Sequence, residues 1–482
     1  MILLQADDIT VSDGKTRLLA PLSLRLEAGQ PLVILGETGS GKSLMAQALM
    51  GTLPEELDAK GQVMICGQVL DPAAPQTFRG LWGRDIGVLP QEPWLSLDPL
   101  MRARRQVAET HALVRGLGRA EAWARADADL VGLGLAGAGA HYPHQLSGGM
   151  AQRVAIAAAR AGGARVVIAD EPTKGLDAAR RDGVADLLLS EMGETGGLLV
   201  ITHDLSLARR IGGQMIVLRA GEVVERGATA QVFAAPQAAY TKDLFAADPE
   251  CWTKRAPTGH GGQPVIRAEG LALARGGKTL FENVSLALAP GDIYGVSGPS
   301  GCGKSSLGDA MLGLVRPLAG TITRRRDEPQ FAFQKLYQDP VSAFPRKRCI
   351  GQSIADVVRK TGSTGDRVEE LLDRLDLAPG LLARRPGAVS GGELQRLSLL
   401  RVLLREPSFI FADEPTSRLD PITQKRVIAL LAETAGRDGV AVMLVSHDRA
   451  LIGKTANAVL SLGALDAQED ASPRGHVALA LQ

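Results

Sequence analysis

Cysteine is scarce in this sequence. Its 482 residues include four cysteines, Cys66, Cys251, Cys302 and Cys349, and no two of them form a C-x-x-C pair. Zinc and iron–sulfur frameworks are built from closely spaced thiols, so this spacing excludes an ordinary framework of either kind. Few, isolated cysteines are typical of a reducing compartment.

The sequence also lacks the features that direct a chain into a membrane or out of the cell. No apolar run approaches the roughly 18 residues that a membrane-spanning helix needs. Residues 1–8 have neither a basic region nor a long apolar core, so we expect no signal peptide. The net charge is only +1, without the basic excess typical of a dedicated nucleic-acid binder. These absences predict a cytosolic protein.

What the sequence does have is length and apolar content. A chain of 482 residues exceeds one ordinary domain and predicts two or three. Its 45% hydrophobic and 22% charged residues form a globular composition. The chain can therefore bury two separate cores.

A glycine-rich loop follows an apolar run near the N-terminus. Residues 31–35 predict a buried strand, and residues 44–50 predict a helix packed on a sheet. Between them lies a complete G-x-x-x-x-G-K-[ST] pattern, formed by Gly36, Glu37, Thr38, Gly39, Ser40, Gly41, Lys42 and Ser43. In this pattern backbone N–H groups surround phosphate oxygens, the lysine reaches the β- and γ-phosphates, and the serine hydroxyl binds Mg²⁺. We therefore predict a nucleotide site here.

The same pattern occurs a second time, again after an apolar run, at residues 293–296. It is formed by Gly298, Pro299, Ser300, Gly301, Cys302, Gly303, Lys304 and Ser305. We interpret Cys302 as a tolerated small side chain rather than a redox group. The chain is thus predicted to hold two nucleotide sites.

Five features recur along the chain in the same order. The two loop lysines are 262 residues apart. Four later pairs are 243 to 247 residues apart: Gln91 and Gln338, Ser147 and Ser390, Glu171 and Glu414, His203 and His447. This spacing predicts a tandem duplication of one domain. The separation between the copies is smaller after the lysines, so the second copy is shorter there. This predicts a shortened hairpin in the second copy, near residues 324–326.

The order of predicted elements is the same in both copies. Alternating segments at 23–26 and 285–288 predict a small β layer. Residues 99–146 and 349–389 are helical in character. Apolar strands follow at 166–169, 198–201, 409–412 and 442–445. Strands that alternate with helices predict an α/β fold with a mainly parallel sheet. We place the domains at 1–247 and 265–482, with a linker at 248–264.

Two acidic residues end one apolar strand in each copy. They are Asp170 and Glu171 in the first copy and Asp413 and Glu414 in the second. Ligands of α/β folds bind at the carboxyl ends of strands, so the aspartate can hold Mg²⁺ there. The adjacent glutamate is placed to act as a general base on an attacking water.

Histidine and glutamine complete the predicted chemistry. His203 and His447 follow later apolar strands and can hydrogen-bond a γ-phosphate. The glutamines at 91 and 338 are suited to sensing Mg²⁺ or water. The predicted metal set is therefore Ser43, Gln91, Asp170, Ser305, Gln338 and Asp413. Phosphoryl transfer needs mainly positioning and charge stabilisation, which this set supplies.

A Ser-Gly-Gly-x-x-Gln-Arg motif occurs once in each copy. It begins with Ser147, Gly148 and Gly149 in the first copy and with Ser390, Gly391 and Gly392 in the second. With this motif both halves resemble ATP-binding-cassette (ABC) ATPase domains, over nearly the whole chain. A serine, two glycines and a helix N-terminus form a second anion cradle.

The ABC resemblance implies tandem P-loop NTPase domains, each with a small antiparallel β layer and a helical subdomain. It implies ATP and Mg²⁺ as ligands, ATP hydrolysis, and intramolecular pairing of the two domains. In that pairing each ATP lies between two motifs, joining Lys42 with Ser390 and Lys304 with Ser147. Asp177 and Asp420 resemble the dimer-contact aspartates of the family.

The segment after the first ATPase core resembles that of one importer group. Residues 232–236, followed by Tyr240 and the Thr-Lys-Asp-Leu after it, are similar to the tail motif of importers for oligopeptides, dipeptides, nickel and similar solutes. This implies a subunit peripheral on the inner face of the cell membrane. Its partners would be two transmembrane permease subunits and an extracytoplasmic solute-binding protein, with no nucleic acid. The second half lacks this tail.

One departure from the family concerns adenine. The family usually places an aromatic residue roughly 29 positions before the loop lysine, where it stacks on the base. Asp13 and Arg275 occupy these positions here. A guanidinium can stack on a base, whereas a carboxylate cannot. We therefore predict weaker ATP binding, and less discrimination against GTP, at the Lys42 site.

Two alternative functions stay open. A sugar importer with fused ATPase halves is disfavoured by the tail motif and by the intact second signature. A soluble tandem ABC translation factor usually has a long charged helical linker, and the linker here is short and mixed. The transported solute cannot be assigned, because specificity would reside in the partners.

Overall fold

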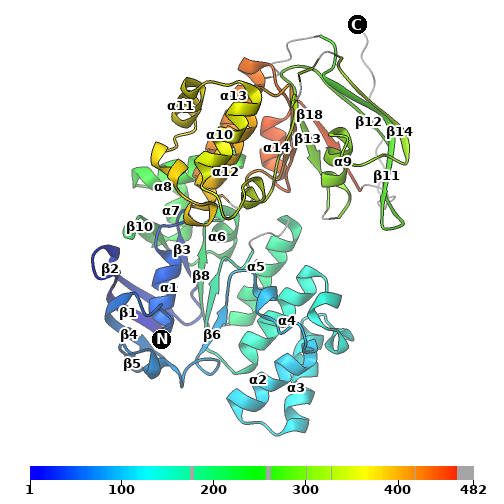
Figure 1. The fold of residues 1–482 in the computed structure, drawn as a ribbon. Coiled ribbons are helices and arrows are strands. Elements are labelled where there is room, and N and C mark those ends of the chain that lie inside the picture. The colour runs from blue at the N-terminus through cyan, green and yellow to red at the C-terminus, as the bar shows by residue number, and fades with distance from the viewer. Residues whose placement is uncertain are drawn as a thin grey trace. The chain divides into compact units, whose positions relative to one another are not determined.

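The computed structural model describes residues 1–173, 178–256, 262–299, 301–326, 328–329, 331–417 and 419–463 (Figure 1). The chain divides into two compact units. The first comprises Met1–Trp252 together with residues 419–425, and the second comprises the other described residues from Thr253 onward. This division falls inside the segment 248–264, and the predicted domain boundaries stay predictions. Ser300, Asp177, linker residues 257–261 and the segment 464–482 lie outside the described residues.

A six-stranded sheet forms the centre of the first unit, in the order β10-β9-β3-β8-β7-β6. Its strands are β3 (Leu32–Leu35), β6 (Ile86–Leu89), β7 (Val166–Asp170), β8 (Gly197–Thr202), β9 (Gln214–Arg219) and β10 (Glu222–Ala228). All neighbours pair in parallel except β10, which is antiparallel to β9. β3 and β8 are buried at every residue, as parallel strands covered on both faces must be.

A small antiparallel sheet packs on one side of this centre, in the order β2-β1-β4-β5. Its strands are β1 (Ile2–Ser12), β2 (Arg17–Glu27), β4 (Asp58–Ile65) and β5 (Gln68–Leu70). Alternate residues of this layer share one core with α1 (Lys42–Met50) and the central sheet; Leu4, Leu49 and Ile168 are examples. Burying side chains of this size stabilises the fold by roughly 1.5–3 kcal/mol each.

Helices cover the other side of the first central sheet. They are α4 (Gly148–Ala161), α5 (Ala178–Met192), α6 (Leu205–Ile211), α7 (Thr229–Ala234) and α8 (Ala239–Ala246). Their core includes Val200, Leu207 and Leu244. A helical subdomain adds α2 (Ala103–Arg115) and α3 (Arg119–Gly132), which pack on α4 around a separate core. Short 3₁₀ helices occupy Pro75–Phe78, Pro93–Ser96, Ala138–Ala140, Pro143–Gln145 and Pro249–Cys251.

The second unit repeats this plan. Its central sheet is parallel throughout, in the order β15-β16-β17-β13-β18. The strands are β13 (Ile293–Ser297), β15 (Phe333–Leu336), β16 (Phe409–Asp413), β17 (Ala441–Val445) and β18 (Ala458–Ser461). The antiparallel layer is β12-β11-β14, made of β11 (Ile266–Arg275), β12 (Lys278–Leu288) and β14 (Ala319–Arg324).

The helices of the second half, α9 to α14, follow the order of α1 to α6 in the first. They are α9 (Lys304–Met311), α10 (Ile350–Thr361), α11 (Gly365–Arg374), α12 (Gly391–Leu403), α13 (Pro421–Asp438) and α14 (Arg449–Thr455). The 3₁₀ helices are Pro340–Ala343, Pro379–Ala383 and Pro386–Ala388. In the part of the chain that the structure describes, no helix is both long and apolar enough to cross a membrane.

The predicted fold class is confirmed in both units. Each has a mainly parallel sheet, a small antiparallel layer and helices from the predicted regions. The first unit places β5 and a 3₁₀ helix between β4 and β6, whereas the described residues between β14 and β15 add no strand. This difference matches the shortened hairpin predicted for the second copy.

Candidate functional site

Each glycine-rich loop connects a parallel strand to a helix. The first runs from β3 to α1 and the second from β13 to α9. The last glycines of the motif, Gly41 and Gly303, precede the helices with φ of 96° and 102°, a left-handed conformation that favours glycine. A Cβ on the first glycine, Gly36, would lie 2.3 Å from the carbonyl oxygen of Leu218. The motif glycines are therefore needed for the turn and for close backbone packing.

The two loops fit a phosphate group. Among the described residues, no side chain caps the N-terminus of α1 or of α9, so the first N–H groups of each helix can bind another acceptor. Gly39 and Gly301 have φ of 85° and 81°, and a Cβ on either residue would meet no atom within 4 Å. Open backbone beside a helix N-terminus is a favourable anion site.

Each loop lysine folds back on its own loop. Lys42 Nζ donates hydrogen bonds to the carbonyl oxygens of Gly36 and Glu37, both at 2.7 Å. Lys304 does the same with the two corresponding carbonyls, at 2.8 and 2.9 Å. Burial lowers the pKa of Lys42, and the carboxylate of Glu171 opposes this shift. Both ammonium groups thus lie at the loop where phosphate would bind.

The predicted serine and aspartate of each metal site lie side by side. Ser43 Oγ donates to Asp170 Oδ2 at 3.1 Å, and Ser305 Oγ donates to Asp413 Oδ1 at 3.1 Å. Hydroxyl and carboxylate oxygens are ligands that Mg²⁺ prefers. These pairs therefore fit a Mg²⁺ ion, which their oxygens would hold.

The predicted bases lie directly after β7 and β16. Glu171 and Glu414 have φ of 49° and 47°, a conformation that is uncommon for residues other than glycine and clusters at functional sites. His203 Nδ1 lies 2.6 Å from Glu171 Oε1, and His447 Nε2 lies 2.8 Å from Glu414 Oε1. Each histidine is thus brought to its own glutamate.

Glu171 is held in its ionised form. Burial alone would raise its pKa, but the charge and hydrogen bond of His203 keep that pKa below its ordinary value. Thr202, which the sequence did not single out, donates its hydroxyl to the second carboxylate oxygen at 3.2 Å. An ionised, oriented carboxylate is what a general base requires.

The two glutamines differ in their contacts. Gln338 Nε2 donates to Glu414 Oε2 at 2.9 Å. Gln91 lies exposed just after β6. In the second unit the glutamine is therefore brought to the predicted base rather than to the serine–aspartate pair.

The signature serines begin helices. Ser147 caps α4 and accepts the N–H of Met150 at 3.3 Å. Ser390 caps α12, accepts the N–H of Glu393 at 3.3 Å and donates to its carboxylate at 2.7 Å. A Cβ on Gly148, Gly149 or Gly391 would meet nothing within 4 Å. The helix starts are therefore open enough for a large anion, and the second also carries an acidic side chain.

Lys335 is a neighbour of the second site that the sequence analysis missed. Its Nζ lies 2.6 Å from Asp309 Oδ1 and 3.9 Å from Asp413 Oδ2. In the second sheet Lys335 of β15 pairs with Phe411, two residues before Asp413. The corresponding pair in the first sheet is Val88 of β6 with Ile168, two residues before Asp170, so the first unit has valine in place of the lysine. The available signal was a lysine one residue before the end of a short strand, at a position where the first copy has valine.

We predict that Lys335→Val lowers the Mg²⁺ concentration needed by the second site. The lysine charge competes with the cation for Asp413, but Asp309 neutralises much of it, so we expect a shift of about three- to tenfold. The measurement is a Mg²⁺ titration of ATP hydrolysis in a Glu171→Gln background. Lys360→Val, an exposed lysine of α10, is the control. An unchanged Mg²⁺ midpoint would contradict the prediction.

The positions predicted to face adenine lie at two hairpin turns. The exposed carboxylate of Asp13 accepts the N–H groups of Lys15 and Thr16, at 2.9 and 2.6 Å. These hydrogen bonds lower the pKa of Asp13. Arg275 ends β11 beside a turn made of glycine. Asp13 therefore has a local role in closing the β1–β2 turn.

A parallel sheet with a phosphate loop after one of its inner strands, repeated in two units, defines a tandem P-loop nucleoside triphosphatase. The model of the ABC transporter family matches residues 19–174 and 281–417. The chain belongs to the ABC transporter family, and within it the chain is an ATP-binding, ATP-hydrolysing subunit.

Relatives of known sequence cover nearly the whole chain. The glutathione import ATP-binding protein GsiA of Salmonella typhimurium is 33% identical over 92% of this chain and 81% of its own length. The uncharacterized ABC transporter ATP-binding protein YejF of Escherichia coli K12 is 33% identical over 92% of this chain and 89% of its own. An archaeal ribosome recycling factor, solved with a ribosomal stalk protein, covers 92% of this chain and 84% of its own, with a TM-score of 0.64. At 21% identity it shares the fold alone.

Proposed function

We propose that this chain powers a membrane importer of peptides, nickel or a similar small solute. The observation that carries the proposal is the 33% identity to a glutathione import ATP-binding protein over 92% of the chain. The tail after the first core, α7 and α8, supports the same group of importers. The partners would be two permease subunits and a solute-binding protein outside the membrane, with this chain peripheral on its inner face.

The residues described above receive specific roles in this proposal. The loop N–H groups and the loop lysines bind the phosphates of ATP, and the two signature motifs supply further phosphate contacts. Ser43 and Asp170 would hold Mg²⁺ in the first unit, and Ser305 and Asp413 in the second. The predicted ligands Gln91 and Gln338 would join these pairs only on ATP binding, when Gln338 would have to leave Glu414. Mg²⁺ when bound would neutralise charge that develops on the phosphates. The chain's own contribution is positioning and proton transfer.

Hydrolysis is assigned to the glutamate and histidine of each unit. Glu171 and Glu414 would accept a proton from the attacking water. His203 and His447 hold these carboxylates in place and would reach the γ-phosphate. Since both units have the complete pair within hydrogen-bonding distance, we propose that both sites hydrolyse ATP.

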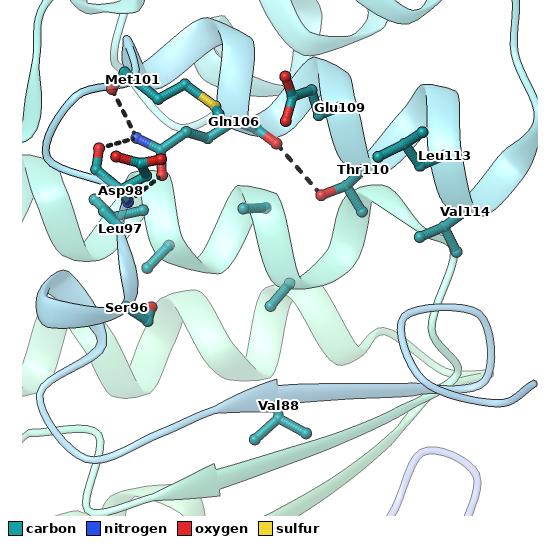
Figure 2. Close-up of a pocket in the computed structure, with 13 residues that line it drawn as sticks. Val88, Ser96, Leu97, Asp98, Met101, Gln106, Glu109, Thr110, Leu113 and Val114 are labelled. Atoms are coloured by element: carbon teal, nitrogen blue, oxygen red, sulfur yellow. Dashed lines mark hydrogen bonds between the residues drawn. The ribbon is translucent and has the colours of Figure 1, made fainter. Parts of the chain in front are cut away.

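A groove on the first unit supports docking of a permease. It lies between α2, α4 and β6, has a volume of about 410 Å³, and is lined mainly by apolar side chains (Figure 2). Leu113, which lines it from α2, is 81% exposed, and Leu95 and Leu100 nearby in the chain are 70% and 87% exposed. Exposed apolar side chains beside a groove are typical of an interaction site.

Acidic and polar side chains also line the groove. Asp98 and Glu109 both line it, and Gln106 links the segment together by donating to the carbonyl oxygen of Met101 at 2.9 Å (Figure 2). Arg105 pairs with Glu109 at 2.9 Å, which leaves Asp98 as the negative end. We propose that the occupant is a short permease segment with apolar side chains and one basic residue.

Reconstitution with the cognate permeases is expected to raise ATPase activity, because the membrane partners set the productive spacing of the sites. Leu113→Glu places a charge in the groove and should reduce this stimulation severalfold. Val69→Glu, at an exposed position of β5, is the matched control and should leave the stimulation by permeases unchanged. Phosphate release in vesicles is the measurement. Full activity without permeases would contradict the proposal.

The alternative of a translation factor rests on the fold alone. The archaeal ribosome recycling factor shares the architecture at 21% identity, whereas the import protein is 33% identical. Stimulation of the ATPase by ribosomes, and not by permeases, would favour that alternative. The fused sugar-importer alternative would be favoured by sugar uptake with the cognate permeases.

A further inference from the structure

One hydrogen bond joins the tail of the first unit to its phosphate loop. The hydroxyl of Tyr240, in α8, accepts the backbone N–H of Glu37 at 3.1 Å. That N–H belongs to the peptide group between Gly36 and Glu37, whose oxygen accepts Lys42 Nζ at 2.7 Å. A peptide group is planar, so fixing its N–H also fixes the direction of its oxygen. The tyrosine hydroxyl therefore orients the carbonyl that holds the loop lysine.

Tyr240 is itself held firmly in the first unit. Its side chain is only 5% exposed and packs in the core beneath the central sheet. The guanidinium of Arg219, at the end of β9, lies 5.0 Å from the ring centre. Glu225 of β10 accepts the N–H groups of Gln237 and Ala238, at 2.8 and 3.1 Å, just before α8 begins. The beginning of α8 is thus tied to the β9–β10 hairpin, through Glu225 before the helix and through Arg219 at Tyr240.

The second phosphate loop is built without this contact. Pro299 occupies the place of Glu37, and proline has no N–H to donate. Lys304 Nζ still reaches the Gly298 carbonyl, at 2.8 Å. Proline fixes its own φ, so the second loop gains rigidity from its sequence rather than from a tail. The two loops therefore reach the same lysine contact by different means.

We propose that Tyr240 is a positioning residue for nucleotide binding at the first site. Its hydroxyl holds the Gly36–Glu37 peptide, and through it Lys42, so the phosphate affinity of the first site depends on the tail that follows the first ATPase core. The second site is independent of any such residue. This inference rests on the proposed nucleotide site at Lys42.

Tyr240→Phe tests the inference, because it removes the hydroxyl and keeps the buried ring. With the second site disabled by Lys304→Ala, AMP-PNP with Mg²⁺ should bind the first site about two- to tenfold more weakly, the loss expected for one hydrogen bond. Tyr294→Phe, on the strand that leads into the second loop, is the matched control and should leave first-site affinity unchanged. Calorimetric titration gives both affinities.

A double-mutant cycle separates positioning from packing. Glu37→Pro places proline in the first phosphate loop, as Pro299 is in the second, and removes the N–H that Tyr240 accepts. If the hydroxyl acts through this N–H, Tyr240→Phe should have no further effect on affinity in the Glu37→Pro background. An equal loss in both backgrounds would overturn the inference, since the tyrosine would then act by another route.

Hydrogen exchange provides a readout that needs no nucleotide. In the ligand-free protein the Glu37 amide should exchange faster in Tyr240→Phe than in the parent, whereas Tyr294→Phe should not change it. Unchanged exchange together with unchanged AMP-PNP affinity would overturn the inference. If Lys42→Ala in the Lys304→Ala background left binding intact, the nucleotide site itself would be wrong, and the inference with it.

Discussion

Replacing Glu171 with glutamine should lower ATP turnover at the first site by about 10² to 10⁴, the loss typical of a missing general base. The carboxylate is kept ionised by His203 at 2.6 Å, and an amide in its place cannot accept a proton. The contacts of Lys42 and Ser43 are untouched, so ATP should still bind. Glu414→Gln should have the same effect at the second site.

The measurement is phosphate release by the transporter assembled with its permeases, with ATP binding followed in parallel. Glu406→Gln is a matched control, because Glu406 is an exposed glutamate with the same positive φ, 47°, as Glu414. If either substitution left turnover of the assembled transporter unchanged, that site would be regulatory and the proposal of two hydrolytic sites would fail.

The second large effect concerns adenine binding. Asp13→Tyr should tighten ATP at the first site, because a base–aromatic stack is worth roughly 1–3 kcal/mol, or about five- to 150-fold. Part of this gain is offset because the exchange removes the two turn hydrogen bonds that Asp13 accepts. Chemistry at saturating ATP should persist, since the phosphate contacts are unchanged. Discrimination between ATP and GTP should increase.

Site-resolved titration checks this prediction. ATP and GTP are titrated against the first site in a Lys304→Ala background and against the second in a Lys42→Ala background. Asp13→Asn, which keeps an acceptor for the turn, is the control, and Arg275→Ala should loosen the second site. Equal wild-type affinities with no response to either substitution would show that another group holds the base.

The features that the sequence predicted correctly depend on local pattern and repetition. A phosphate loop has its own strand and helix as neighbours, so its place in the fold is visible from residues 31–50. The nearness of Ser43 to Asp170 follows from the rule that ligands bind at the carboxyl ends of parallel strands. The same rule applies at Ser305 and Asp413.

The features that were missed depend on contacts between distant segments. Tyr240 is 203 positions from Glu37 in the sequence. No local sequence pattern predicts that the Tyr240 hydroxyl accepts the Glu37 N–H. Lys335 reaches Asp413 only because β15 and β16 are neighbours in the sheet. Such contacts are decided by tertiary packing.

The most direct test of the account is ATP-dependent solute uptake. Vesicles containing the cognate permeases, this chain on the inner face and the solute-binding protein outside should accumulate a dipeptide, nickel or a similar solute only when ATP is inside. The double variant Glu171→Gln, Glu414→Gln should abolish uptake while still binding ATP. Uptake that persists in the double variant, or ATP hydrolysis that responds to ribosomes and not to permeases, would contradict the account.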